Sequence, residues 1–269
     1  RLAAAGFTRI SLGMQSADPQ VLHRLDRTHN PDNVARAVEF VRAAGMEVSL
    51  DLIYATPGES MASWLESLQV AIALAPDHLS AYALGIEPGT KLGAALARGE
   101  IPPVADYDAA EKYERADQLL HASGYRWYEV SNWARTAGDG SIKSCRHNLH
   151  YWRGDHWWGF GPGAHGHIGG VRWMNVKHPL GYAQLLTDGR LPVARREILD
   201  AKARHEEHVM LGIRLREGID LPASVSPTRV SELVADGLLQ REAAAQGRAI
   251  LTLRGRLLAD PVTYALLGI

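Results

Sequence analysis

Cysteine is almost absent from this sequence, which contains a single residue of this type, Cys145, among 269. One cysteine excludes an internal disulfide framework and is typical of a reducing compartment such as the cytoplasm. A lone thiolate supplies neither a zinc site of paired cysteines nor the ligands of an iron–sulfur cluster. We therefore expect no metal-ligand role for Cys145, and its neighbours become the candidates.

The sequence also lacks long apolar runs and an excess of charge. No run approaches the roughly 20 apolar residues that span a bilayer, and no basic start followed by an apolar segment is present. The 29 basic and 30 acidic residues nearly cancel, so no overall field favours nucleic acid or a membrane surface. We expect a cytoplasmic protein with one large domain or two smaller ones.

Strand and helix patterns alternate in the first part of the chain. Strands are predicted over residues 8–14, 47–54 and 78–84. Helices are predicted between them, after the N-caps Asp18, Asn30 and Ser60. This order predicts parallel strands joined by helical crossovers. Residues 1–6 are typical of the tail of a helix that ends at a glycine, so we expect the chain to begin within a domain.

The second part of the chain is predicted to contain a long helix, an α+β segment and a small terminal domain. The elements expected there are a helix over 104–123, a strand over 125–130, helices over 197–216 and 227–236, a β-hairpin over 239–253 and a last helix. Helices with a two-stranded wing are typical of a winged helix, so we expect domains 1–190 and 191–269. Arg229 stands beside two acids in its helix, so we expect no nucleic-acid contact.

Polar side chains mark the ends of the predicted parallel strands, where the chemistry of α/β barrels is found. Gln15, Asp51 and Glu87 occupy such positions. Asp51 interrupts an apolar strand, and a buried carboxylate without a partner would cost several kcal/mol. It should therefore face either a polar ligand or a basic side chain such as Arg27, and the sequence leaves both alternatives open.

A second candidate site lies in residues 145–170, which contain five histidines and several tryptophans. His147 and His150 are spaced like metal ligands on a helical turn, but no cysteine pair completes a zinc site. A haem would need an axial histidine, aromatic walls and basic groups, all of which this segment contains. The alternative is a purely structural role, in which the aromatic residues form part of the hydrophobic core. The glycines at 159, 161 and 163 do not match a phosphate-binding loop, so we expect close backbone approaches or turns.

Several motifs carry a family resemblance. RISLGMQS at 9–16, LDR at 25–27, LDLIYATPG at 50–58 and HLSAY at 78–82 resemble the radical S-adenosylmethionine (SAM) proteins of the oxygen-independent coproporphyrinogen III oxidase group. CRHNLHYW at 145–152 is similar to the HNxxYW signature of HemW, the haem-chaperone branch of that group.

The resemblance implies an α/β fold: the second half of a partial (β/α)6 radical SAM barrel, an α+β extension and a small winged-helix-like C-terminal domain. It implies SAM, a [4Fe-4S] cluster and haem as bound groups. By position, Gln15, Arg27 and Asp51 match SAM-binding residues, and His147 matches the haem-binding histidine. Gly85 and His165 fall loosely near further cofactor-lining positions. No residue is assigned a catalytic role.

The CxxxCxxC motif that ligates the cluster in the family is absent here. We therefore expect a C-terminal part of a longer protein, with the cluster held by the full-length protein only. The resemblance implies a haem chaperone that passes haem to an acceptor protein, a respiratory one being an option, and it leaves peripheral membrane contact open. The alternatives are an oxygen-independent coproporphyrinogen III oxidase and a non-catalytic interaction module.

Overall fold

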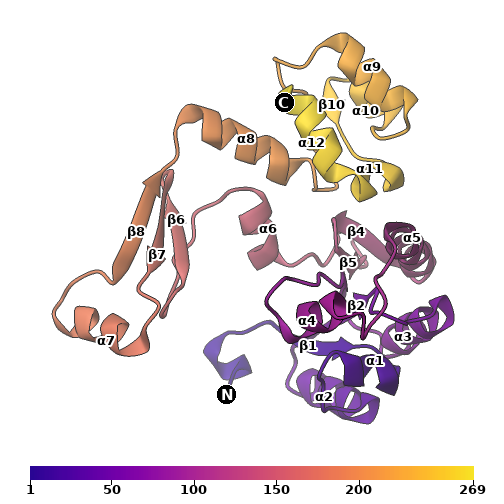
Figure 1. Ribbon diagram of the computed structural model, residues 1–269, viewed down its shortest axis with the longest axis vertical. Helices are drawn as coiled ribbons and strands as arrows, with labels where there is room; N and C mark the ends of the chain where they lie inside the picture. Colours follow the sequence, from indigo (N-terminus) through magenta and orange to yellow (C-terminus); the bar gives the residue numbers. More distant parts are fainter. The chain divides into compact units, whose positions relative to one another are not determined.

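The structure is a computed structural model that describes residues 1–269, and its contacts divide the chain into two compact units (Figure 1). Unit 1 comprises residues 1–144 and unit 2 comprises residues 145–269. This division falls just before the HNxxYW segment, and the domain boundary expected at residue 190 stays a prediction. None of the helices combines the length and the apolar character that crossing a membrane requires.

Unit 1 is built on a mixed five-stranded sheet. Its strands are β1 (Arg9–Gln15), β2 (Glu47–Tyr54), β3 (His78–Ala83), β4 (Tyr125–Glu129) and β5 (Asn132–Arg135). Its helices are α1 (Pro19–Arg24), α2 (Pro31–Ala43), α3 (Met61–Ala73), α4 (Lys91–Ala97) and α5 (Asp106–Ala122), after a 3-10 turn at Ala3–Ala5. The strand order is β1-β2-β3-β5-β4, in which β1, β2 and β3 run parallel and β5 pairs antiparallel with both β3 and β4. The predicted α/β fold with parallel strands and helical crossovers is confirmed.

The predicted helix starts in unit 1 are confirmed by their caps. The side chains of Asp18, Asn30 and Ser60 each accept a hydrogen bond from a backbone N–H in the first turn of the helix that follows. These bonds satisfy donors that have no partner within the helix. Helix α1 ends at Arg24, and Asp26 has a positive φ of 56° in the turn beyond it.

The two faces of the unit 1 sheet differ in chemistry because side chains alternate along each strand. One face is apolar: Leu50, Leu52 and Leu79 are fully buried, and Tyr54 contacts the ring of Trp64 on α3 at a centroid distance of 5.3 Å. Helix α2 also packs against β1 and β2. The strand register places a row of polar residues on the other face, namely Ser11, Ser49, Asp51, His78 and Ser80. We call this second face the polar face.

Unit 2 contains a three-stranded antiparallel sheet and a helical C-terminal region. Its strands are β6 (His165–Ile168), β7 (Val171–Asn175) and β8 (Val193–Ile198), with β9 (Ile219–Asp220) paired to β10 (Arg248–Ala249). Its helices are α6 (Arg146–Trp152), α7 (Pro179–Thr187), α8 (Ala201–Gly212), α9 (Pro227–Ala235), α10 (Arg241–Ala245), α11 (Leu253–Leu257) and α12 (Ala259–Leu267). Buried apolar residues of α8, α9 and α12, such as Val209, Leu233 and Leu266, belong to one cluster.

Two segments of unit 2 differ from the sequence-based expectation. The charged helix expected from residue 197 begins only at Ala201, and residues 193–198 form β8, which pairs with β7. All six residues of β8 are exposed, so no apolar alternation marks this strand in the sequence. The hairpin expected over 239–253 is reduced to a single antiparallel bridge between Leu239 and Leu251. Residues 241–245 (REAAA) form α10 instead, because alanine favours helix, and β10 pairs with β9.

Candidate functional site

The polar face of unit 1 holds Asp51 beside Ser11. The Ser11 hydroxyl donates to Oδ2 of Asp51 at 2.7 Å, and the two residues belong to neighbouring strands. The ion pair with Arg27 that the sequence left open is not formed. Arg27 is exposed beyond α1, and its guanidinium makes no hydrogen bond or ion pair. The Asp51 carboxylate therefore keeps most of its acceptor capacity unused.

Gln15 lies next to Asp51 in an unusual conformation. Its φ is 63°, at the irregularity where the pairing of β1 with β2 shifts between Gly13 and Gln15. Positive φ in a residue other than glycine costs on the order of 1–3 kcal/mol and often marks a functional position. A Cβ on Gly13 would lie 2.7 Å from the side-chain nitrogen of Gln15, so the glycine lets this amide fold back over the strand. Since Gly13 pairs with Asp51, the amide and the carboxylate share one patch of the polar face.

The turn that contains Arg27 is attached to the end of β1 through His29. A ring nitrogen of His29 lies 3.1 Å from the carbonyl oxygen of Met14. This bond holds the turn at the carboxyl end of the strand that carries Gln15. The backbone therefore places Arg27 at the same end of the sheet, although its side chain contacts neither Gln15 nor Asp51.

A buried histidine extends the polar face, and the sequence analysis did not identify it. His78 lies between Ser49 and Tyr128: its Nδ1 is 2.8 Å from the Ser49 hydroxyl, and its Nε2 is 2.8 Å from the Tyr128 hydroxyl. Burial lowers the pKa of His78 to about 3, with a smaller effect of the positive charge on Arg9. The ring is therefore neutral at physiological pH. The three members are far apart in sequence, and only strand pairing brings them together.

Gly85 and Glu87, also considered from the sequence, lie in the loop after β3. Both are exposed, and the volume around a Cβ on Gly85 is empty. The structure thus brings Gln15 and Asp51 together and leaves Gly85 and Glu87 at the surface.

The second site lies in unit 2, where α6 carries the HNxxYW segment. His147 is exposed, neither of its ring nitrogens makes a hydrogen bond, and its ring meets that of Tyr151 edge-on at 5.1 Å. Ring contacts continue from Tyr151 to Trp157 at 4.9 Å, from Trp157 to His167 at 4.9 Å, and from His167 to His156 at 6.1 Å. We call these five residues the ring ladder.

The remaining histidines and glycines of this segment have structural explanations. Nδ1 of His150 lies 2.6 Å from Oδ2 of Asp155, which gives His150 a local hydrogen-bond partner. His165 is exposed at the start of β6. A Cβ on Gly159 would lie 1.9 Å from the carbonyl oxygen of His165, and Gly161 has a φ of 99°. The expectation that these glycines permit close approaches and turns is therefore confirmed.

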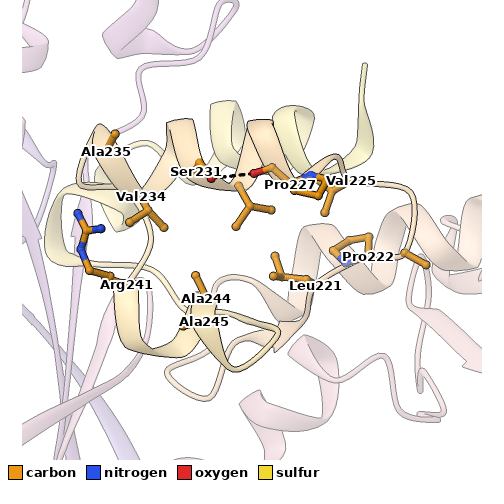
Figure 2. Close-up of a pocket in the computed structure, with 12 residues that line it drawn as sticks. Leu221, Pro222, Val225, Pro227, Ser231, Val234, Ala235, Arg241, Ala244 and Ala245 are labelled. Atoms are coloured by element: carbon orange, nitrogen blue, oxygen red, sulfur yellow. Dashed lines mark hydrogen bonds between the residues drawn. The ribbon is translucent and has the colours of Figure 1, made fainter.

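A separate cavity of about 510 Å³ lies in the C-terminal region of unit 2 (Figure 2). Its lining is mainly apolar and includes Leu221, Val225 and Val234. The Ser231 hydroxyl donates to the carbonyl oxygen of Pro227 at 2.9 Å. The cavity shares no residue with the polar face or the ring ladder.

Comparisons with known proteins identify the family. The model of the radical SAM superfamily matches residues 1–71. A Mycobacterium tuberculosis protein named "Heme chaperone HemW" is 49% identical over 270 residues, which cover 99% of this chain and 67% of that protein. A Bacillus subtilis protein of the same name is 30% identical over 278 residues, covering 99% of this chain and 71% of that protein. The chain belongs to the HemW family.

Membership of the HemW family confirms the resemblance stated from the motifs. The structure of coproporphyrinogen III oxidase (HemN) from Escherichia coli has a similar fold, with a TM-score of 0.77 at 20% identity over 98% of this chain and 65% of that one. At this identity the likeness concerns the fold alone. The HNxxYW segment of this HemW chain is the helix α6, and its histidine is the exposed end of the ring ladder.

Proposed function

We propose that this protein is a haem chaperone, which binds haem through His147 and passes it to an acceptor protein. The observation that carries the proposal is the exposed imidazole of His147 at the end of the ring ladder. A neutral imidazole nitrogen is the usual axial ligand of haem iron, and aromatic rings provide the surface on which a porphyrin packs. The relatives named haem chaperones support this assignment.

The matched test compares two histidines of the same helix. In a haem titration followed by the absorbance of the bound porphyrin, His147→Ala should weaken binding at least about tenfold, the loss of one metal–ligand contact. His150→Ala is the control because His150 is also exposed on α6 but is hydrogen-bonded to Asp155. Equal haem affinity of the wild type and His147→Ala would remove His147 from the proposed role.

Delivery of haem needs its own measurement. Haem-loaded protein is mixed with an apoprotein that captures free haem, and then with candidate acceptors, respiratory haem proteins first. A chaperone should transfer haem to its acceptor faster than it releases haem to the scavenger. Equal rates for all recipients would indicate passive release and contradict the proposed transfer.

The polar face of unit 1 is proposed as part of a SAM site. The Asp51 carboxylate, hydrogen-bonded here only to Ser11, would accept hydrogen bonds from ribose hydroxyls. The Gln15 amide lies in the same patch, and the exposed guanidinium of Arg27 would hold the methionine carboxylate in a two-pronged contact. These residues fit a polar, zwitterionic nucleoside.

The [4Fe-4S] cluster that the radical SAM family implies does not fit the residues of this chain. Such clusters are held by several thiolates, and this chain has Cys145 alone. SAM binding is tested by calorimetric titration, in which Asp51→Asn should lower the affinity while Asp32→Asn, an exposed carboxylate on α2, should not. Equal effects of the two substitutions would refute the site.

A coproporphyrinogen III oxidase activity is the other function that the family resemblance implies. The shared fold with HemN is its support, and a fold alone does not determine an activity. No residue contact in the two sites favours it over haem binding.

A further inference from the structure

A small cavity adjoins the ring ladder in unit 2. Its volume is about 290 Å³, and it lies among the end of α6, the turn between β6 and β7, and helix α8. His156 and His167, the last two rings of the ladder, belong to its lining, and so does Trp152 of the HNxxYW segment. This cavity is therefore next to the proposed haem-binding surface and part of the same unit.

Basic and hydrogen-bond-donating side chains dominate the polar lining of this cavity. Arg204 donates from Nη1 to the carbonyl oxygen of Leu199 at 2.6 Å, which leaves its other N–H groups without a carboxylate partner. His208, one turn further along α8, makes no hydrogen bond or ion pair. Nε2 of His156 accepts from the backbone N–H of Gly169 at 3.2 Å, so the proton of the neutral ring lies on Nδ1. Its Nδ1–H is therefore a free donor.

The one carboxylate in the lining is already neutralised. Glu207 on α8 forms an ion pair with Arg172 on β7. Arg153 at the rim pairs with Glu217 at 2.8 Å. After these pairs are formed, the charge that remains unpaired is the guanidinium of Arg204. The cavity thus favours an anion.

A buried nitrogen without a partner belongs to a residue that lines the same cavity. His167 is only 9% exposed, and its Nε2 makes no hydrogen bond, while Nδ1 lies 3.3 Å from the carbonyl oxygen of Asp155. Because a carbonyl only accepts, the neutral ring carries its proton on Nδ1, and Nε2 is a bare acceptor. This atom is an unsatisfied polar group of a residue that lines the cavity, and such groups are normally paired with a polar partner.

We propose that this cavity binds carboxylate groups, namely the propionates of haem whose iron is ligated by His147. The inference rests on the proposed haem binding and specifies how the ligand is oriented. A volume of about 290 Å³ falls just below the roughly 300–1,000 Å³ of cavities that enclose whole small molecules, so the cavity suits the arms of a ligand. Helix α6 has seven residues and is roughly 10 Å long, and it connects His147 to the cavity residues at its end. The porphyrin plane would then lie along the ring ladder, with its carboxylates in the cavity.

The test uses haem and haem dimethyl ester, in which both carboxylates are uncharged esters, on the complete chain. The wild type should bind haem about tenfold more tightly than the ester, the effect of one charge-assisted contact. Arg204→Gln should remove this preference by weakening haem binding and leaving ester binding unchanged. The His208 side chain makes no hydrogen bond, and His208→Gln should also reduce the preference for haem over the ester. His205→Gln is the matched control, because His205 is exposed on the same helix and does not line the cavity.

The outcomes separate this inference from the proposed function. If Arg204→Gln and His208→Gln change haem and ester binding equally, the cavity does not hold the propionates and the inference is overturned. If His147→Ala leaves both affinities intact while Arg204→Gln still removes the preference, the iron ligand is wrong and the carboxylate site stands. The last measurement is a titration with succinate, a dicarboxylate without a porphyrin. Succinate binding that Arg204→Gln abolishes, together with unchanged haem binding, would assign the cavity to a separate carboxylate and overturn the assignment to haem.

Discussion

The neutral, buried His78 makes the stability of unit 1 depend on pH. Burial shifts its pKa from 6.5 to about 3. Between these values the unfolded chain binds a proton that the folded chain does not, so the free energy of unfolding falls as the pH is lowered through this range. From about pH 8 to about pH 5 the expected loss is about 2 kcal/mol, because the unfolded ring is almost fully protonated at the lower pH and the folded ring is not.

The measurement must separate His78 from a second group that titrates in the same range. Burial raises the pKa of Glu59 from 4.5 to about 7, against the opposing charge of Lys112. In this case the folded state binds the extra proton, so its contribution to stability falls as the pH rises. The two effects nearly cancel in the wild type, and the pH dependence of the wild type alone would hide both.

The comparison of wild type with His78→Gln isolates the histidine. Glutamine keeps a polar side chain near Ser49 and Tyr128 and does not titrate. Urea unfolding is followed by hydrogen exchange of peptides from β2 and β3 at about pH 8 and about pH 5. The stability advantage of the wild type over the variant should be smaller at the lower pH by about 2 kcal/mol. His121→Gln, at an exposed histidine of α5, should give the same difference at both pH values. A constant difference for His78→Gln as well would refute the reasoning.

Three further predictions concern other buried or unusual groups. Lys112 is fully buried between Asp108 and Glu59, so Lys112→Met should destabilise unit 1 by roughly 3–5 kcal/mol in urea unfolding. The added substitution Glu59→Gln should recover part of this loss, and a loss below about 1 kcal/mol for Lys112→Met would contradict a buried ion cluster. Gly166→Ala should lower the thermal midpoint of unit 2 with a cost of about 1–3 kcal/mol, because the new Cβ would overlap the ring of Trp173, and an unchanged midpoint would disprove this contact. Cys145→Ser should leave haem affinity unchanged, and a clear loss would make the thiol a ligand.

The helices and strands that the sequence predicts correctly are those in which the apolar pattern, the turn residues and the helix caps indicate the same structure. Strands β1 to β3 combine apolar runs with turn residues, and the caps Asp18, Asn30 and Ser60 mark the following helices. Strand β8 was missed because its existence depends on pairing with β7 and its own residues are all exposed. The hairpin expected over 239–253 keeps only the bridge between Leu239 and Leu251, because the alanines of residues 241–245 favour helix.

The candidate sites, too, could be predicted only where the signal lies in the local sequence. Asp51 was recognisable as a carboxylate within an apolar strand, but its partner Ser11 follows from strand register, which the sequence does not display. The contact between His78 and Tyr128 spans fifty residues of sequence. The tautomer of His156 is determined by one backbone N–H of the β6–β7 turn. Contacts of this kind depend on tertiary structure and carry no local pattern.

The position of β1 at the end of the sheet has a consequence for the polar face. One side of β1 pairs with β2, and the backbone groups on its other side have no strand beside them. Such an edge is a template on which another strand can pair. A strand added there would stand beside Ser11, Gly13 and Gln15 and extend the polar face by one strand. Binding of SAM in the proposed site at Asp51 would then be thermodynamically coupled to pairing at this edge wherever the added strand contacts the ligand.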